Sequence, residues 1–204
     1  MPALPLAPAA CGLTLLLAAA TQAGAAPLQV QVSDAQGRPL PDAVVWVDSA
    51  AARAAARPLP GVAITQRQRQ FQPAVSVVTT GSSVSFPNED TVRHHVYSFS
   101  PVKKFEIKLY VGTPAAPVVF DKPGIAVLGC NIHDQMTAWV VVLESPWHAR
   151  SGADGLATLA EVPAGAHTLR VWHPALPPGA PAAEQALSQG AAAGRASLRL
   201  GVGG

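Results

Sequence analysis

The chain reads Leu128-Gly129-Cys130-Asn131-Ile132-His133-Asp134-Gln135-Met136-Thr137 between two apolar, largely β-branched segments, residues 125–128 and 138–143. Both segments are short, and turn-forming residues precede the first of them, which is typical of neighbouring strands. The loop between them therefore carries a thiol, an imidazole and a thioether to one end of a strand pair.

A second motif lies upstream of this loop. It spans residues 88–96 and reads N-x-D-x-V-x-H-x-V. Alternation along an extended strand places Val92, His94 and Val96 on one face and His95 on the other. We therefore expect His94 to point inward and to meet the loop, with His95 as the alternative.

The rest of the middle of the chain has the pattern of an all-β fold. Nine of the eleven aromatic residues lie between Phe71 and Trp147, so the main core is expected there. Seven or eight short strands at this spacing suggest a sandwich. The predicted strands are residues 75–78, 83–86, 95–99, 105–109, 117–120, 125–128 and 138–143.

The flanking segments also predict strands, at residues 28–32, 43–47, 156–159 and 167–172. Their turns, with Asp34 and Gly37 before the second strand and Asp154 and Gly155 before the third, resemble the two halves of a carboxypeptidase-regulatory-like sandwich. The resemblance implies that residues 27–59 and 147–174 form one small sandwich and that residues 60–146 are inserted in it. The alternative is one larger sandwich with extra edge strands.

Two further segments differ in composition from the predicted strands. Residues 49–70 are rich in Ala, Arg and Gln and are expected to connect the two sandwiches. Residues 175–204 form an Ala/Gly/Pro-rich tail that offers little apolar surface to bury. Within this tail, residues 196–200 alternate and predict one last short strand.

The N-terminal segment, residues 1–26, predicts a signal peptide. It has no charged side chain, an apolar run at residues 13–20 and the small residues Ala23, Gly24 and Ala25 at a cleavage position. We therefore expect export to the periplasm. No other segment is long enough and apolar enough to cross a membrane.

Removal of that segment would leave one cysteine, Cys130, and one methionine, Met136, in the mature chain. A lone cysteine excludes an internal disulfide. The charge balance, 14 Lys and Arg against 12 Asp and Glu for a net +2, is too weak for a protein held to nucleic acid or membrane mainly by charge.

The two motifs together supply two imidazoles, one thiolate and one thioether. This is the ligand set of a type 1 copper centre, in which His and Cys side chains bind strongly and Met binds weakly. Zinc is the competing metal, but it rarely takes a thioether. His148, His167 and His173 lie in the flanks and are expected to be packing or surface residues.

The two motifs resemble those of cupredoxins, the small blue copper proteins that include plastocyanin and amicyanin. The C-x2-H-x2-M loop is similar to the short amicyanin loop. Residues 94–101, 120–124 and 128–134 also resemble bacterial "methylamine utilization" proteins with a plastocyanin-like domain. The resemblance covers about 85 residues and implies a Greek-key cupredoxin β-sandwich. It implies that His94, Cys130 and His133 are equatorial ligands and that Met136 is the axial ligand.

The chain departs from the cupredoxin pattern next to three of these positions. His95 stands where cupredoxins usually have Asn, and Asn131 follows the cysteine in place of Ser or Thr. Asp134 stands where a proline is usual near the second histidine. A carboxylate beside His133 would lower the reduction potential or alter the docking surface.

The resulting functional hypothesis is a periplasmic blue copper protein with one type 1 copper ion, acting in one-electron transfer rather than as an enzyme. By analogy with cupredoxins, the electron would pass through His133 to a redox partner protein at a small, transient interface. The alternative is a copper-handling or copper-sensing protein that holds the metal without redox cycling. A third hypothesis is a structural module that attaches to a larger complex through its flanks.

Overall fold

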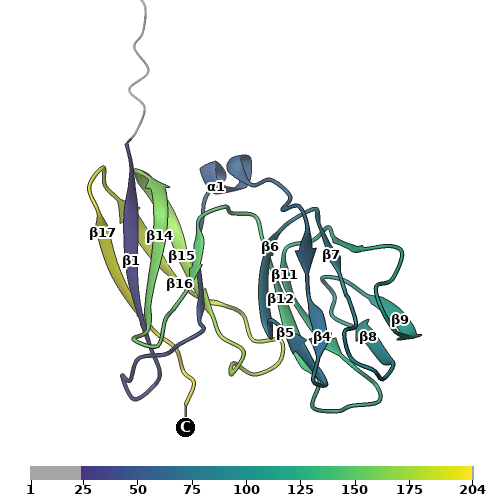
Figure 1. The fold of residues 1–204 in the computed structure, drawn as a ribbon. Helices are drawn as coiled ribbons and strands as arrows, with labels where there is room; N and C mark the ends of the chain where they lie inside the picture. Colours follow the sequence, from purple (N-terminus) through teal and green to yellow (C-terminus); the bar gives the residue numbers. More distant parts are fainter. Residues whose placement is uncertain (1–23, 204) are drawn as a thin grey trace, which may run out of the picture.

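The computed structural model describes residues 24–203, and its strands form two sandwiches that lie side by side (Figure 1). In the first, a three-stranded sheet of order β14-β1-β17 packs against a four-stranded sheet of order β13-β2-β15-β16. Valine and leucine side chains from both sheets fill the core between them. The strands are β1 (Ala25–Ser33), β2 (Val44–Asp48), β13 (His148–Arg150), β14 (Leu156–Pro163), β15 (Gly165–Trp172), β16 (Ala183–Gln189) and β17 (Gly194–Arg199).

The second sandwich packs a five-stranded sheet, β6-β12-β11-β8-β9, against a three-stranded sheet, β10-β7-β3, with the hairpin β4–β5 beside them. Its core includes Phe86, Phe120 and Leu128, and also Cys130 and Met136. The strands are β3 (Val62–Ala63), β4 (Thr65–Arg67), β5 (Gln70–Gln72), β6 (Val75–Thr79), β7 (Ser82–Ser85), β8 (His94–Ser98), β9 (Phe105–Tyr110), β10 (Val118–Phe120), β11 (Gly124–Gly129) and β12 (Thr137–Leu143). The prediction of an all-β sandwich fold is therefore confirmed.

A third apolar cluster joins the two sandwiches. Val44, Trp46 and Trp172 extend from the outer face of the β2–β15 sheet, and Val75, Val141 and Leu143 extend from the outer face of the β6–β12 sheet. The rings of Trp139 and Trp172 lie 6.4 Å apart between them. Alternation explains the arrangement, because neighbouring residues of β2 and β12 point into different cores. Where the two sandwiches meet, the strands β2, β15, β6 and β12 thus contribute side chains to a core on each of their faces.

The segment expected to be a connector carries more structure than its composition predicts. Residues 50–55 form the helix α1 (Ala50–Ala55), which begins where the Ser49 hydroxyl accepts a hydrogen bond from the Ala52 amide at 3.1 Å. The strands β3, β4 and β5 follow, and Ile64 and Phe71 from this part of the chain are core residues. The segment still leads from β2 of the first sandwich to β6 of the second. Its own strands were not predicted, because strands of two or three residues leave no periodic pattern.

The C-terminal region also differs from expectation. The strand predicted at residues 196–200 is present as β17, but β16 was not predicted. β16 pairs with β15, and β17 runs parallel to β1, so both obtain backbone hydrogen bonds from strands already in place. Leu198, Leu200 and Val202 complete the first core. This region is ordered because its strands pair with β15 and β1, and its own composition does not reveal that pairing.

The predicted signal peptide lies mostly outside the described residues. Residues 1–23 are not described, whereas Ala25 and Ala26 belong to β1, where Ala25 pairs with Pro163. Within residues 24–203, no helix has the length and apolar character needed to cross a membrane.

Candidate metal centre

Three of the four predicted ligands meet at one end of the second sandwich. His94, Cys130 and His133 each offer a nitrogen or sulfur atom, and these atoms lie within 4.8 Å of one another. The Cys130 Sγ lies 3.9 Å from His133 Nδ1. The two imidazole rings are 5.0 Å apart between centroids and meet edge to face at 62°. We call these three residues the His–Cys–His group.

The neighbouring strands β8 and β11 bring the group together. β11 ends at Gly129, where it pairs with Tyr97 of β8, and Cys130 follows directly. His94 opens β8. The loop then turns tightly, because the Met136 amide donates a hydrogen bond to the His133 carbonyl at 2.9 Å, and β12 begins at the next residue.

Two members of the group are buried and the third is partly exposed. His94 is fully buried and Cys130 is 3% exposed, whereas His133 is half-buried and is the member that reaches the surface. Met136, the fourth predicted ligand, is 1% exposed and packs in the same apolar cluster as Cys130. The site therefore combines apolar walls with one imidazole at the solvent boundary.

The two nitrogens of His94 have different surroundings. Nε2 lies 2.8 Å from Asp90 Oδ2, whereas Nδ1 is buried without a hydrogen-bond partner among the described residues. A buried polar atom without a partner is uncommon in folded proteins and usually indicates an unseen ligand or a functional role. Because Nε2 is hydrogen-bonded to Asp90, Nδ1 is the nitrogen of His94 that can act as a metal ligand.

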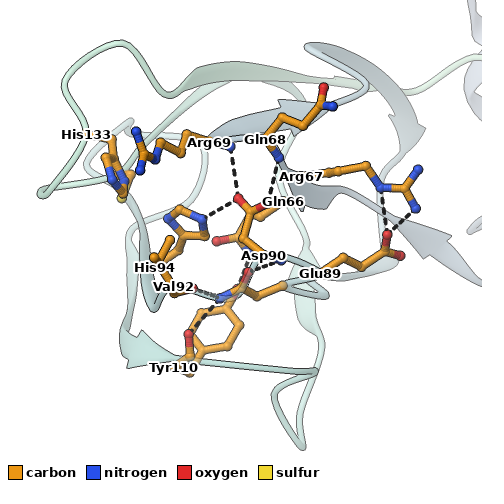
Figure 2. A network of polar contacts seen from close by, with 12 residues as sticks. Gln66, Arg67, Gln68, Arg69, Glu89, Asp90, Val92, His94, Tyr110 and His133 are labelled. Atoms are coloured by element: carbon orange, nitrogen blue, oxygen red, sulfur yellow. Dashed lines mark hydrogen bonds and ion pairs between the residues drawn. The ribbon is translucent and has the colours of Figure 1, made fainter.

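The Asp90 carboxylate accepts hydrogen bonds from several surrounding groups (Figure 2). The amides of Gln68 and Arg69, in the turn of the β4–β5 hairpin, donate to its two oxygens at 2.7 and 2.9 Å. Burial acts to raise the pKa of Asp90, but the hydrogen bonds from Arg69, His94 and Gln68 outweigh it and hold the pKa below its ordinary value. The carboxylate is therefore ionised at neutral pH.

A second buried contact supports the same hairpin. Tyr110 donates a hydrogen bond to the Phe86 carbonyl at 2.6 Å, and the amide of fully buried Gln66 contacts the Tyr110 hydroxyl. Burial raises the pKa of Tyr110 to about 12, so this phenol keeps its proton. The hairpin is thus anchored to β9 as well as to Asp90.

The alternative ligand, His95, lies on the other face of β8. Its side chain is also buried, but its Nε2 lies 3.0 Å from Glu106 Oε1 and its ring packs against Tyr97. The His–Cys–His group contains His94 and not His95.

Val92 differs from expectation: it is exposed, because it precedes the first residue of β8 and alternation does not extend to it. His148, His167 and His173 lie in or after strands of the first sandwich, outside the group.

Sequence reasoning did not find the supporting role of Asp90 or of the β4–β5 hairpin. Asp90 belongs to the N-x-D-x-V-x-H-x-V motif and precedes His94 by four residues, and this spacing is the feature of the sequence that could have indicated its role. Nothing local marks Gln68 and Arg69, since neither is a residue type that favours tight turns.

The donors of the group fit a transition-metal ion. Two imidazole nitrogens and a thiol sulfur are ligands that both copper and zinc accept in proteins. The buried His94 Nδ1, which has no hydrogen-bond partner within residues 24–203, fits the same role, because a metal ion would supply one. A buried thioether nearby is a soft donor that suits copper better than zinc.

No protein-family model and no curated protein sequence matches this chain. Solved structures do match it. A purple cupredoxin from Nitrosopumilus maritimus is 18% identical over 41% of this chain and 100% of that chain, with a TM-score of 0.37. A reduced Cu(I) amicyanin variant is 18% identical over 48% of this chain and 98% of its own, with a TM-score of 0.38.

A Cu-containing nitrite reductase from Thermus scotoductus is 21% identical over 55% of this chain and 28% of that chain, with a TM-score of 0.38. In its structural matches, this chain is similar to cupredoxins, the group that its two sequence motifs resemble.

Proposed function

We propose that this protein binds one copper ion through His94, Cys130, His133 and Met136 and carries single electrons. The observation that supports this most directly is the buried His–Cys–His group, whose His94 Nδ1 has no other partner among the described residues. Bound there, copper would supply a one-electron Cu(II)/Cu(I) couple. Thiolate and thioether ligands favour the reduced ion, and imidazoles serve both oxidation states.

The residues around the group have separable roles in this proposal. Cys130 gives up its proton on binding and supplies the thiolate. Asp90 holds His94 in place through the hydrogen bond at Nε2, and Met136 contributes its sulfur from the apolar cluster beside the site. A site whose side chains are already fixed needs little rearrangement when its charge changes, which favours rapid electron transfer.

His133 is the proposed exit for the electron, because it is the member of the group nearest to solvent. Its neighbour Ile132 is 47% exposed, so an apolar side chain stands beside the exit. A small apolar contact suits a redox partner that must bind and leave quickly. The role as a carrier rather than an enzyme, and the location in the periplasm after export by residues 1–26, belong to the same proposal.

The domain organisation is also proposed rather than established. The strands β3 to β12 all lie between β2 and β13 in the chain, which supports insertion of residues 60–146 into a first sandwich built from residues 27–59 and 147–174. The strands β16 and β17 would extend that first sandwich. The apolar cluster between the two sandwiches, which contains Val44 and Val75, would then be a domain interface.

The function is tested by adding Cu(II) to the apoprotein and recording the visible spectrum. We expect an intense thiolate-to-copper band at one equivalent of copper, absent from Cys130→Ser and from His94→Gln. The matched control is His95→Gln, which removes the adjacent imidazole and should keep the band. A wild-type protein without the band, or a Cys130→Ser variant that retains it, would contradict the proposal.

A copper-handling role is the second candidate, and the half-buried position of His133 favours it by giving the ion a route to solvent. The two functions differ once the ion is bound. A carrier gives reversible voltammetry and keeps Cu(I) in the presence of a mild chelator, whereas a handling protein releases Cu(I) to the chelator. Zinc binding that excludes copper in direct competition would count against both.

A further inference from the structure

The turn of the β4–β5 hairpin has an unusual backbone for its sequence. Gln68 and Arg69 both adopt left-handed conformations, with φ of 54° and 57°, although neither is glycine. Such a conformation is unfavourable for residues other than glycine and is kept only where the surroundings enforce it. The two amides of this turn both point at Asp90, so their hydrogen bonds to the carboxylate offset the cost.

Asp90 is fixed from its own side as well. Its amide donates to Asn88 Oδ1 at 2.9 Å. The Asn88 side chain in turn donates to the carbonyls of Val92 and Tyr110 at 2.9 and 2.8 Å. Asn88 is 5% exposed, so these bonds lie in the protein interior. The carboxylate therefore has a defined position, set by two segments that are separate in the chain.

The donors around Asp90 determine which nitrogen of His94 carries the hydrogen. The amides of Gln68 and Arg69 can only donate, so the Asp90 oxygens act as acceptors in this network. The contact of 2.8 Å between Asp90 Oδ2 and His94 Nε2 then requires a hydrogen on Nε2. In the neutral ring the other nitrogen, Nδ1, is left with its lone pair.

We propose that Asp90 is a positioning residue for the metal centre: held by the Gln68–Arg69 turn, it fixes His94 as the Nε2–H tautomer with its Nδ1 lone pair available to the His–Cys–His group. This inference deepens the proposed function and rests on it for the identity of the ion. A carboxylate behind a ligating imidazole orients the ring and makes it a better donor. The better donor favours Cu(II) over Cu(I), so Asp90 lowers the reduction potential of the site.

The first test uses the apoprotein and needs no metal. Nitrogen-15 NMR of the histidine side chains distinguishes the two tautomers, and His94→Gln identifies the His94 signals by their loss. We expect the Nε2–H tautomer alone in the wild type. An Nδ1–H tautomer in the folded wild-type protein would overturn the proposal, and this result does not depend on any variant folding.

The second test compares Asp90→Ala with Glu89→Ala. Glu89 is a matched control, because it is the preceding carboxylate and pairs with Arg67 rather than with His94. We expect an Nδ1–H population to appear only in Asp90→Ala. In the copper protein, Asp90→Ala should also lower the preference for Cu(II) over Cu(I) about tenfold, which is about 59 mV for one electron.

The outcomes separate this proposal from the proposed function. If folded Asp90→Ala keeps both the tautomer and the potential of the wild type, Asp90 is not a positioning residue. If Glu89→Ala changes the potential equally, a general charge effect replaces the specific one and overturns the proposal. If the wild type has the Nε2–H tautomer but gives no copper band, the positioning of His94 stands and the copper function fails.

Discussion

The ring of Tyr97 lies directly over the Cα atom of Gly129, the residue that precedes the candidate thiolate. A Cβ atom at Gly129 would come within 2.7 Å of both the ring carbon Cζ and the hydroxyl of Tyr97. The two residues are paired across β8 and β11, so the ring crosses the strand that leads into the loop. Glycine at this position therefore allows the two strands to keep their register beside the site.

The Gly129→Ala variant should be less stable than the wild type. Overpacking of this kind costs about 1–3 kcal/mol, and Tyr97, which is only half-buried, can absorb part of it by moving. Urea unfolding of the apoprotein measures the loss. In a Tyr97→Ala background the same substitution should cost much less, because the clashing ring is gone. Equal losses in the two backgrounds would show that the ring is not the cause.

The stability of the first sandwich should decrease in acid because of Asp34. Burial pushes the pKa of Asp34 up, but hydrogen bonds from Arg38 and Gln36 outweigh it and hold the pKa below the ordinary value of 3.8. A carboxylate with a lowered folded-state pKa stabilises the protein fully above the unfolded value. This contribution is lost as the pH falls through the lower, folded value.

Denaturation of the apoprotein between pH 6 and pH 2 tests this expectation. Asp34→Asn should be less stable than the wild type at pH 6. The difference should begin to shrink below about pH 4 and should vanish once the pH has fallen through the lower pKa of Asp34 in the folded protein, where the wild type also loses this charge. Glu144→Gln, which neutralises an exposed carboxylate, serves as the control. A difference that stays constant across the whole range would exclude Asp34 as the source.

The cluster between the sandwiches should couple their unfolding. Trp172 is 4% exposed there and packs against Val75, Val141 and Leu143 of the second sandwich. Replacing a buried tryptophan by alanine typically costs about 3–5 kcal/mol. We expect the wild type to unfold in one calorimetric transition and Trp172→Ala in two, since the shared contacts that link the sandwiches are weakened.

Trp147→Ala is the control for this experiment. Trp147 is half-buried and packs against the first core, away from the shared cluster. The Trp147→Ala variant should have a lower transition temperature than the wild type but should still unfold in a single transition. If Trp172→Ala still unfolds in a single step, the two sandwiches form one cooperative unit through other contacts.

The sequence predicts the parts of this fold that repeat a local pattern. The continuous apolar run at residues 138–143 predicted β12, whose two faces fill different cores. The alternation at residues 28–32 predicted β1, because one face of that strand fills the first core. The meeting of Cys130 and His133 also followed from their spacing on one short loop. The ligand roles themselves, Met136 included, stay predictions that the copper titration tests.

The parts that were missed depend on contacts between distant segments. β16 forms because β15 offers a free edge, and neither strand reveals this alone. Buried Gln66 reads as a surface residue, yet it lies in the interior against Tyr110 of β9. The left-handed turn at Gln68 is stabilised by Asp90, more than twenty residues away in the chain. Short-range patterns contain none of this information.

The proposed exit at His133 predicts a charge-sensitive surface at Ile132. Ile132 is 47% exposed and precedes His133 in the loop. When two copies exchange an electron through their exits, Ile132→Lys places like charges opposite each other. We expect the self-exchange rate, measured by NMR line broadening in mixtures of Cu(I) and Cu(II) protein, to fall about tenfold at low salt. The loss should recover near 1 M salt, where the screening length is about 3 Å.

Val119→Lys is the matched control, since Val119 is 42% exposed on β10, a strand that carries none of the four proposed ligands. It adds the same charge to an apolar surface position and should leave the rate nearly unchanged. Both variants should keep the copper band of the wild type, because neither residue belongs to the His–Cys–His group. If Val119→Lys slows the exchange as much as Ile132→Lys, net charge controls the encounter and the electron does not leave preferentially at His133.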